Sequence, residues 1–224
     1  MRVSIFSVIG PVMIGPSSSH TAGAARLSRA ARTIFGRPVK SVSFGLCGSF
    51  ARTWCGHGTD LALAAGALGL SADDERLPDA FEIAREQNVD ISFYESEYES
   101  EYENTVVMRF SDYDGKTEEI IGSSIGGGQI VITSVDGFCT DLTLTNPVLL
   151  IRQNDSKGIV SAVSGVLAKR DFNIAQMQLI RRARGGAACC VIETDLPLPE
   201  DIAQEIAAIP GIEEAEIIRP FAGA

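Results

Sequence analysis

The sequence predicts an α+β protein built from two domains, residues 1–146 and 147–224. A chain of 224 residues has room for one large domain or two small ones. The segment Thr145-Asn146-Pro147 marks the boundary, because proline disfavours helix in the residue before it and often opens an extended element. With 45% apolar and 21% charged residues, the composition is that of a globular protein and argues against disorder, collagen or coiled coil.

The first domain mixes helical and extended patterns. Alanine, leucine and arginine at helical spacing predict a helix over 18–35, and residues 48–70 are mostly helical with one glycine-rich interruption. A shorter helix is predicted over 80–87. Strands are predicted over 39–44, 89–93, 105–110, 118–122 and 129–133. Asp114-Gly115 predicts a hairpin, and Gly126-Gly127-Gly128 predicts a tight turn or a close backbone approach.

The second domain has a more regular pattern. Its predicted elements are a strand over 148–152, a helix over 158–170, strands over 174–182 and 187–194, a helix opened by Pro199, and a strand over 212–218. The order βαββαβ is the ferredoxin-like arrangement. We therefore expect a four-stranded sheet with two helices in this domain.

Several classes of protein and site are excluded by simple features. The longest apolar run, 61–70, is too short to cross a bilayer, and Pro11, Gly15 and Pro16 interrupt the N-terminal stretch that could be mistaken for a leader. The five cysteines form no C-x-x-C motif, which argues against a zinc knuckle or a thioredoxin-like site. We expect reduced, buried thiols at Cys189-Cys190 and a cytoplasmic location.

Charge is distributed unevenly along the chain. The net charge of −10 lacks the basic surplus of a nucleic-acid binder. Residues 1–72 carry seven Lys and Arg against one acid, whereas residues 73–119 carry sixteen acids against four bases. The acidic stretch is typical of a solvated face, and the basic first third fits an anionic ligand or an acidic partner.

One histidine stands in a hydroxyl-rich segment, Gly15-Pro16-Ser17-Ser18-Ser19-His20-Thr21, beside the start of the predicted helix. Hydroxyls at a helix start cap free N–H groups, and the same groups attract a carboxylate or phosphate. One serine suffices for a cap. Four hydroxyls and a histidine therefore favour a ligand-binding or catalytic role, with capping and turn formation as the alternative.

The other histidine, in a chain that has only two, lies in Gly56-His57-Gly58-Thr59-Asp60. Flanking glycines let the backbone and the ring approach a ligand, and Thr59 and Asp60 are placed to orient the imidazole. Histidine titrates near neutral pH and suits proton abstraction. A polar helix break with a satisfied histidine is the alternative. The two histidines have no Cys or carboxylate neighbours at metal-ligand spacing, so we expect no zinc site. The separate glycine-rich loop at 122–128 lacks a Gly-Lys-Ser/Thr continuation, which argues against a nucleoside triphosphatase.

The motifs GPSSSHT at 15–21, GHGTD at 56–60 and SIGGG at 124–128, followed by the βαββαβ module, resemble the beta chain of iron–sulfur-dependent L-serine dehydratases. The resemblance extends from Ile5 to Ile218. The first domain is also similar to the allosteric substrate-binding domain of some phosphoglycerate dehydrogenases. The second domain resembles an ACT domain, a small amino-acid-sensing fold.

This resemblance implies a lyase that converts L-serine to pyruvate and ammonia with a [4Fe-4S] cluster and without pyridoxal phosphate. The cluster's cysteine ligands would lie on a separate alpha chain, so we expect no metal ligands in this chain. His20 and His57 would be catalytic, with the choice of general base between them open. The implied substrate-binding residues are Ser17, Ser18, Ser19, Thr21, Gly58 and Thr59.

The implied partners are the alpha chain, L-serine and a second copy of this chain through either domain, but neither nucleic acid nor membrane. In the ACT-like domain, Asn154, Asp155 and Gly158 lie in the first strand–helix loop, where such modules bind amino acids. Lys157 stands where a family loop often has proline, which leaves a regulatory site and a purely dimerising module as alternatives. For the whole chain, the alternatives are a non-catalytic serine sensor and a plain structural subunit.

Overall fold

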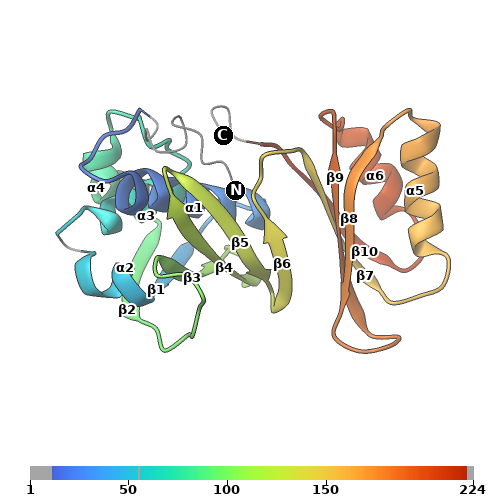
Figure 1. The fold of residues 1–224 in the computed structure, drawn as a ribbon, viewed down its shortest axis with the longest axis horizontal. Coiled ribbons are helices and arrows are strands. Elements are labelled where there is room, and N and C mark those ends of the chain that lie inside the picture. Colours follow the sequence, from blue (N-terminus) through green and yellow to red (C-terminus); the bar gives the residue numbers. More distant parts are fainter. Residues whose placement is uncertain (1–11, 55, 221–224) are drawn as a thin grey trace. The chain divides into compact units, whose positions relative to one another are not determined.

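The computed structural model describes residues 12–54 and 56–220 (Figure 1). Most of the N-terminal stretch that we compared with a leader lies outside the described residues, as does Cys55. In the part of the chain that is described, none of the helices combines the length and the apolar character needed to span a bilayer.

The chain folds into two compact units, and the boundary between them falls at the last strand of a six-stranded sheet. The strand order of this sheet is β2-β1-β3-β4-β5-β6. Its strands are β1 (Ser41–Leu46), β2 (Asp90–Glu95), β3 (Thr105–Ser111), β4 (Thr117–Gly126), β5 (Gln129–Val135) and β6 (Phe138–Leu142). β1 and β2 run parallel, whereas β3 and β4 form the antiparallel hairpin predicted at Asp114-Gly115. The boundary between the units crosses β6.

Five of these strands confirm the sequence predictions, and β6 was not predicted. Its five residues alternate between buried and exposed, with Cys139 and Asp141 on the exposed side. A strand this short, with a charged residue at one of its positions, gives too weak an alternation to stand out from a loop.

The helices of the first unit precede β1 or lie between β1 and β2 in the sequence. They are a π-helix, η2 (Ser18–Gly23), followed by α1 (Ala24–Phe35), α2 (Gly48–Thr53), α3 (Thr59–Ala67), a 3₁₀ turn, η3 (Leu77–Asp79), and α4 (Ala80–Glu86). α1 packs against β3, β4 and β5, and α3 packs against α1. The helix predicted over 18–35 is therefore α-helical only in its second part, and the one over 48–70 is divided at the glycine-rich turn, as predicted.

α1 and α3 pack closely against each other at Gly66. A Cβ atom at this position would lie 2.3 Å from the carbonyl oxygen of Ala25 and 2.8 Å from the amide nitrogen of Arg29. Both atoms belong to the backbone of α1 and cannot move independently of the helix. Only glycine fits at position 66 without separating the two helices.

The second unit has the predicted βαββαβ order. Its elements are β7 (Val148–Asn154), α5 (Ile159–Lys169), β8 (Ile174–Arg181), β9 (Ala187–Thr194), α6 (Glu200–Ala207) and β10 (Ile212–Ile218). The strand order is β10-β7-β9-β8 with antiparallel neighbours, which confirms the ferredoxin-like arrangement. β8 and β10 are the edge strands of this sheet.

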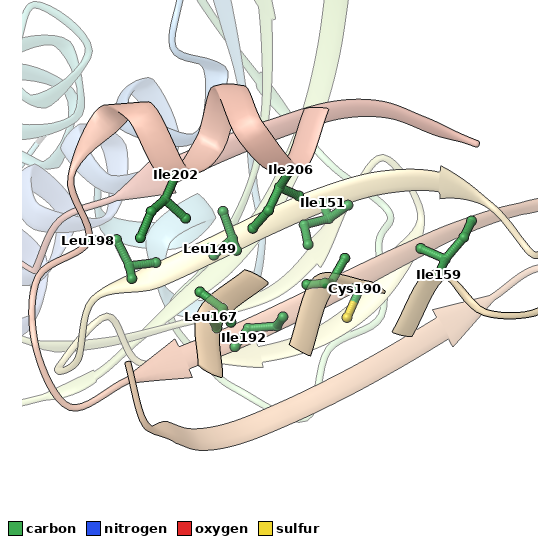
Figure 2. Close-up of a cluster of buried hydrophobic side chains, with 10 residues drawn as sticks. Leu149, Ile151, Ile159, Leu167, Cys190, Ile192, Leu198, Ile202 and Ile206 are labelled. Carbon is green, nitrogen blue, oxygen red and sulfur yellow. The ribbon is translucent and has the colours of Figure 1, made fainter. Parts of the chain in front are cut away.

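Apolar side chains from the two helices and the two central strands form the core of this unit. Figure 2 shows Ile202 and Ile206 on α6 directed toward Leu149 and Ile151 on β7. Cys190 on β9 belongs to the same cluster, and burial raises the pKa of its thiol to about 11. The thiol is therefore protonated at neutral pH and serves as a small apolar core residue.

Candidate functional site

The GPSSSHT segment begins a helix that is wound more widely than an α-helix. The amides of Thr21 and Ala22 both donate to the carbonyl of Ser17, at 2.8 and 3.3 Å, so the turn includes the five-residue spacing of a π-helix. Ser17 also caps this turn, because its Oγ accepts a hydrogen bond from the His20 amide at 3.1 Å. One serine therefore meets the capping need of this turn.

The SIGGG motif lies beside this π-helix. A Cβ atom on Gly23 would lie 2.0 Å from Oγ of Ser124, so glycine is required for the close contact between η2 and β4. Arg26 donates a hydrogen bond from Nη1 to the carbonyl of Gly128 at 2.9 Å and ties α1 to the same loop. The glycine-rich turn thus supports the segment that carries His20.

The imidazole of His20 is half-buried between residues of α2. Its Nε2 lies 3.2 Å from Oγ of Ser49, and the ring meets the Phe50 ring edge-on at 5.2 Å between centroids. Partial burial lowers the pKa of His20, and the nearby His57 lowers it further. Both causes favour the neutral ring at physiological pH.

His57 lies exposed in the turn between α2 and α3. Its Nδ1 is 3.3 Å from the backbone carbonyl of Thr53. A carbonyl oxygen can only accept a hydrogen bond, so the neutral ring carries its proton on Nδ1 and has its free lone pair on Nε2. Gly58 follows in the left-handed region, with φ of +65°, and leads into α3.

The two histidines meet although they lie 37 positions apart in the sequence. Their ring centroids are 5.2 Å apart with the rings tilted by 41°. Thr21 reinforces the arrangement, since its Oγ1 donates to the carbonyl of His57 at 3.4 Å. The GPSSSHT and GHGTD motifs therefore lie side by side in the fold.

Other residues predicted for this site are placed differently. Thr59 and Asp60 were expected to orient the His57 ring, but in the structure the ring donates a hydrogen bond from Nδ1 to the backbone carbonyl of Thr53. Thr59 is fully buried, and its Oγ1 has no partner among the described residues. Ser18 and Ser19 are half-buried on the π-helix, and neither hydroxyl forms a hydrogen bond within residues 12–54 and 56–220.

Three residues that sequence reasoning missed lie on α2: Ser49, Phe50 and Thr53. Ser49 is the first hydroxyl after β1, and a polar residue at the end of a strand is the signal that could have identified it. Thr53 contacts His57 through its carbonyl, which any residue type would supply. No side-chain pattern could therefore reveal that contact.

In the second unit, the candidate regulatory residues extend from the last residue of β7 to the residue before α5. Asp155 is already engaged there, because its Oδ2 accepts hydrogen bonds from the Gly185 amide and from Arg181, both at 3.0 Å. These two bonds lower the pKa of the Asp155 carboxyl. Asn154 and Gly158 lie on either side of it, and Gly158 precedes α5 with φ of +92°. The loop is thus fastened to the β8–β9 turn.

The described residues do not form a metal site of their own. Within 12–54 and 56–220, no three His, Cys, Asp or Glu side chains gather closely enough to hold a metal ion. Of the cysteines in those ranges, Cys47, Cys189 and Cys190 are buried and Cys139 is exposed. This donor set does not fit an iron–sulfur cluster, which requires several convergent thiolates.

Comparisons with known proteins add a family context. The family described as "Serine dehydratase beta chain" matches residues 4–85. The chain is 42% identical over 209 residues to the probable L-serine dehydratase beta chain of Bacillus subtilis, covering 93% of this chain and 94% of that one. It is 35% identical over 216 residues to the L-serine dehydratase beta chain of Peptoniphilus asaccharolyticus, covering 96% and 97%. These two similarities include both units of the fold.

Two further similarities cover less of the chain. The D-3-phosphoglycerate dehydrogenase of Synechocystis is 32% identical over 98 residues, which are 44% of this chain and 18% of that enzyme. Among solved structures, the ACT domain from the GTP pyrophosphokinase of Chlorobium tepidum is 20% identical with a TM-score of 0.28, covering 32% of this chain and 95% of that one.

Proposed function

Because this chain belongs to the family of L-serine dehydratase beta chains, we propose that it acts as one subunit of a two-chain lyase that converts L-serine to pyruvate and ammonia. Loss of the α-proton and the β-hydroxide as water leaves aminoacrylate, which hydrolyses to the two products. The observation that supports a catalytic role for this chain is the meeting of its two histidines, with rings 5.2 Å apart.

In this proposal, His57 is the general base. The Thr53 carbonyl favours a proton on Nδ1, which leaves the Nε2 lone pair free to take the α-proton of serine. The ring is exposed on this chain, which suits a site that a partner subunit completes. His20 stays neutral, because partial burial and the neighbouring imidazole lower its pKa.

The hydroxyl-rich turn binds the substrate carboxylate. Ser17 is used as the cap and Thr21 bonds the His57 carbonyl, which leaves Ser18 and Ser19 for the ligand. Gly58 caps the start of α3, where backbone amides favour an anion, but the amide of Thr59 already donates to the Trp54 carbonyl at 3.2 Å and is not offered to the ligand. The basic charge of residues 1–72 supports the same binding mode.

The cluster implied by the resemblance is proposed to be ligated by the alpha chain, since the described residues of this chain do not supply its ligands. Bound there, it would provide a Lewis acid for the serine hydroxyl. The tasks left to this chain are proton removal by His57 and substrate positioning by the π-helix.

Mixing the two purified chains tests the proposal. We expect an alpha chain whose cluster has been reconstituted anaerobically to form pyruvate from L-serine only when this chain is added. The rate should saturate as this chain is titrated in, because the site requires residues from both. An alpha chain that reaches the full rate alone would contradict the proposal.

For the second unit, we expect no regulatory serine site that depends on Asp155, because its carboxylate already holds Arg181 and the Gly185 amide. Calorimetry of the full chain with millimolar L-serine should give the same heat for the parent and for Asp155→Asn. Heat that disappears in Asp155→Asn but persists in Glu213→Gln, an exposed neighbour on the same sheet, would establish the regulatory alternative instead.

The remaining role of this unit is dimerisation, which we propose to occur along an edge strand. β8 and β10 are the edges of its sheet, and Leu179 on β8 is 42% exposed. Unpaired strand edges readily add a second strand.

A further inference from the structure

Both backbone groups of Ser49, near the start of α2, form hydrogen bonds. Its amide donates to the carbonyl of Glu103 at 2.7 Å, and its own carbonyl accepts a hydrogen bond from Oγ1 of Thr53 at 2.8 Å. Gly48 allows this close approach: its φ is +55°, and a Cβ atom there would lie 2.4 Å from the same Glu103 oxygen. The backbone of Ser49 is therefore fixed from two sides.

The side chain of Ser49 faces His20. Oγ of Ser49 lies 3.2 Å from Nε2 of the ring, and within the described residues this nitrogen is the one partner of the hydroxyl. If Nε2 carried the proton, the serine hydroxyl would accept it and its own hydrogen would lack an acceptor in the described residues. If Nε2 carries the lone pair, the hydroxyl donates to it and both groups are satisfied.

We propose that Ser49 is a positioning residue for His20. The Ser49 hydroxyl donates a hydrogen bond to Nε2 of His20 and holds the neutral ring with its proton on Nδ1. The contact concerns this chain alone, whereas its catalytic consequence rests on the proposed function. The two histidines then differ in kind. His57 has a free lone pair and removes a proton, whereas His20 presents an N–H group that can bind the carboxylate of the substrate.

The titration of His20 tests the contact without any catalysis. The chain has only two histidines, so NMR of the untagged full chain gives two imidazole signals, and His57→Ala assigns them. A hydrogen bond to the lone pair stabilises the neutral ring, so Ser49→Ala should raise the pKa of His20 by roughly half a unit to one unit. The nitrogen shifts of the parent should show the proton on Nδ1.

Two further variants separate this effect from a structural one. Ser49→Thr retains the hydroxyl and should keep the parent titration. Ser41→Ala removes a serine hydroxyl from β1, where it bonds Ser111, and should leave His20 unchanged. A His20 titration that is the same in Ser49→Ala as in the parent, or a proton found on Nε2, would overturn the inference.

Kinetics of the two-chain enzyme then test the catalytic consequence. Ser49→Ala should raise the KM for L-serine about tenfold and lower kcat/KM by the same factor, with recovery in Ser49→Thr. If the NMR titration shifts but these parameters do not, the hydrogen bond stands and His20 has no part in substrate binding. That outcome would count against the proposed function rather than against the contact.

Discussion

Replacing His57 with alanine should lower the turnover of the two-chain enzyme by roughly 100- to 10,000-fold, the contribution typical of a general base. The reason is the placement of its ring: the Thr53 carbonyl holds Nδ1 and leaves Nε2 to accept the α-proton. The measurement is the initial rate of pyruvate formation, with the cluster content of each preparation matched by its absorbance.

The matched variant is His20→Ala, which removes the second imidazole of the pair. A loss of roughly 100- to 1,000-fold is expected if this ring stabilises the reacting carboxylate, as oxyanion donors do. Near-full rates in both variants, with an intact cluster, would exclude the catalytic assignment. A serine sensor would behave in a third way, since its variants would lose regulation and retain the basal rate.

Replacing Gly66 with alanine should lower the free energy of unfolding of the first unit by about 1–3 kcal/mol, the usual cost of overpacking. The added methyl group would lie 2.3 Å from the Ala25 carbonyl and force α3 away from α1. The chain has a single tryptophan, Trp54, which lies in this unit. Its fluorescence in a urea titration therefore reports the unit's own transition.

Gly165→Ala provides the control in the other unit. Gly165 lies inside α5, and a Cβ atom there would meet nothing within 4 Å. Alanine should therefore stabilise this unit by about 0.5–1 kcal/mol, because it favours helix and restricts the unfolded chain. The Trp54 transition should not move. Equal Trp54 midpoints for Gly66→Ala and the parent would show that the α1–α3 contact has room to relax.

The fold was predictable where the apolar periodicity of a segment and the residues at its ends indicated the same helix or strand. The second unit is the best case: β9 and β10 have the predicted limits, and the helix opened by Pro199 begins at Glu200. The first unit was less accessible, because its strand order joins β1 to β2 and to β3 across long connections. Local pattern cannot specify such non-local pairing.

The site was predictable through its side chains and not through its backbone. His20 and His57 stood out because polar, glycine-flanked segments around a histidine are unusual in a helical stretch. Their orientation depends on the Thr53 carbonyl and on the π-helical turn, which are features of the backbone. Ser49 was missed for a related reason, since the contact with His20 exists only after α2 packs beside η2.

The π-helical turn makes the length of the hydroxyl-rich segment as important as its composition. Deleting Ser19 would let the chain close into ordinary α-helical spacing, and each residue of an α-helix turns by about 100° around the axis. The imidazole of His20 would then rotate away from Ser49 and from its companion ring. Homologous chains that keep this chemistry should accept exchanges among the small polar residues here long before they accept an insertion or a deletion.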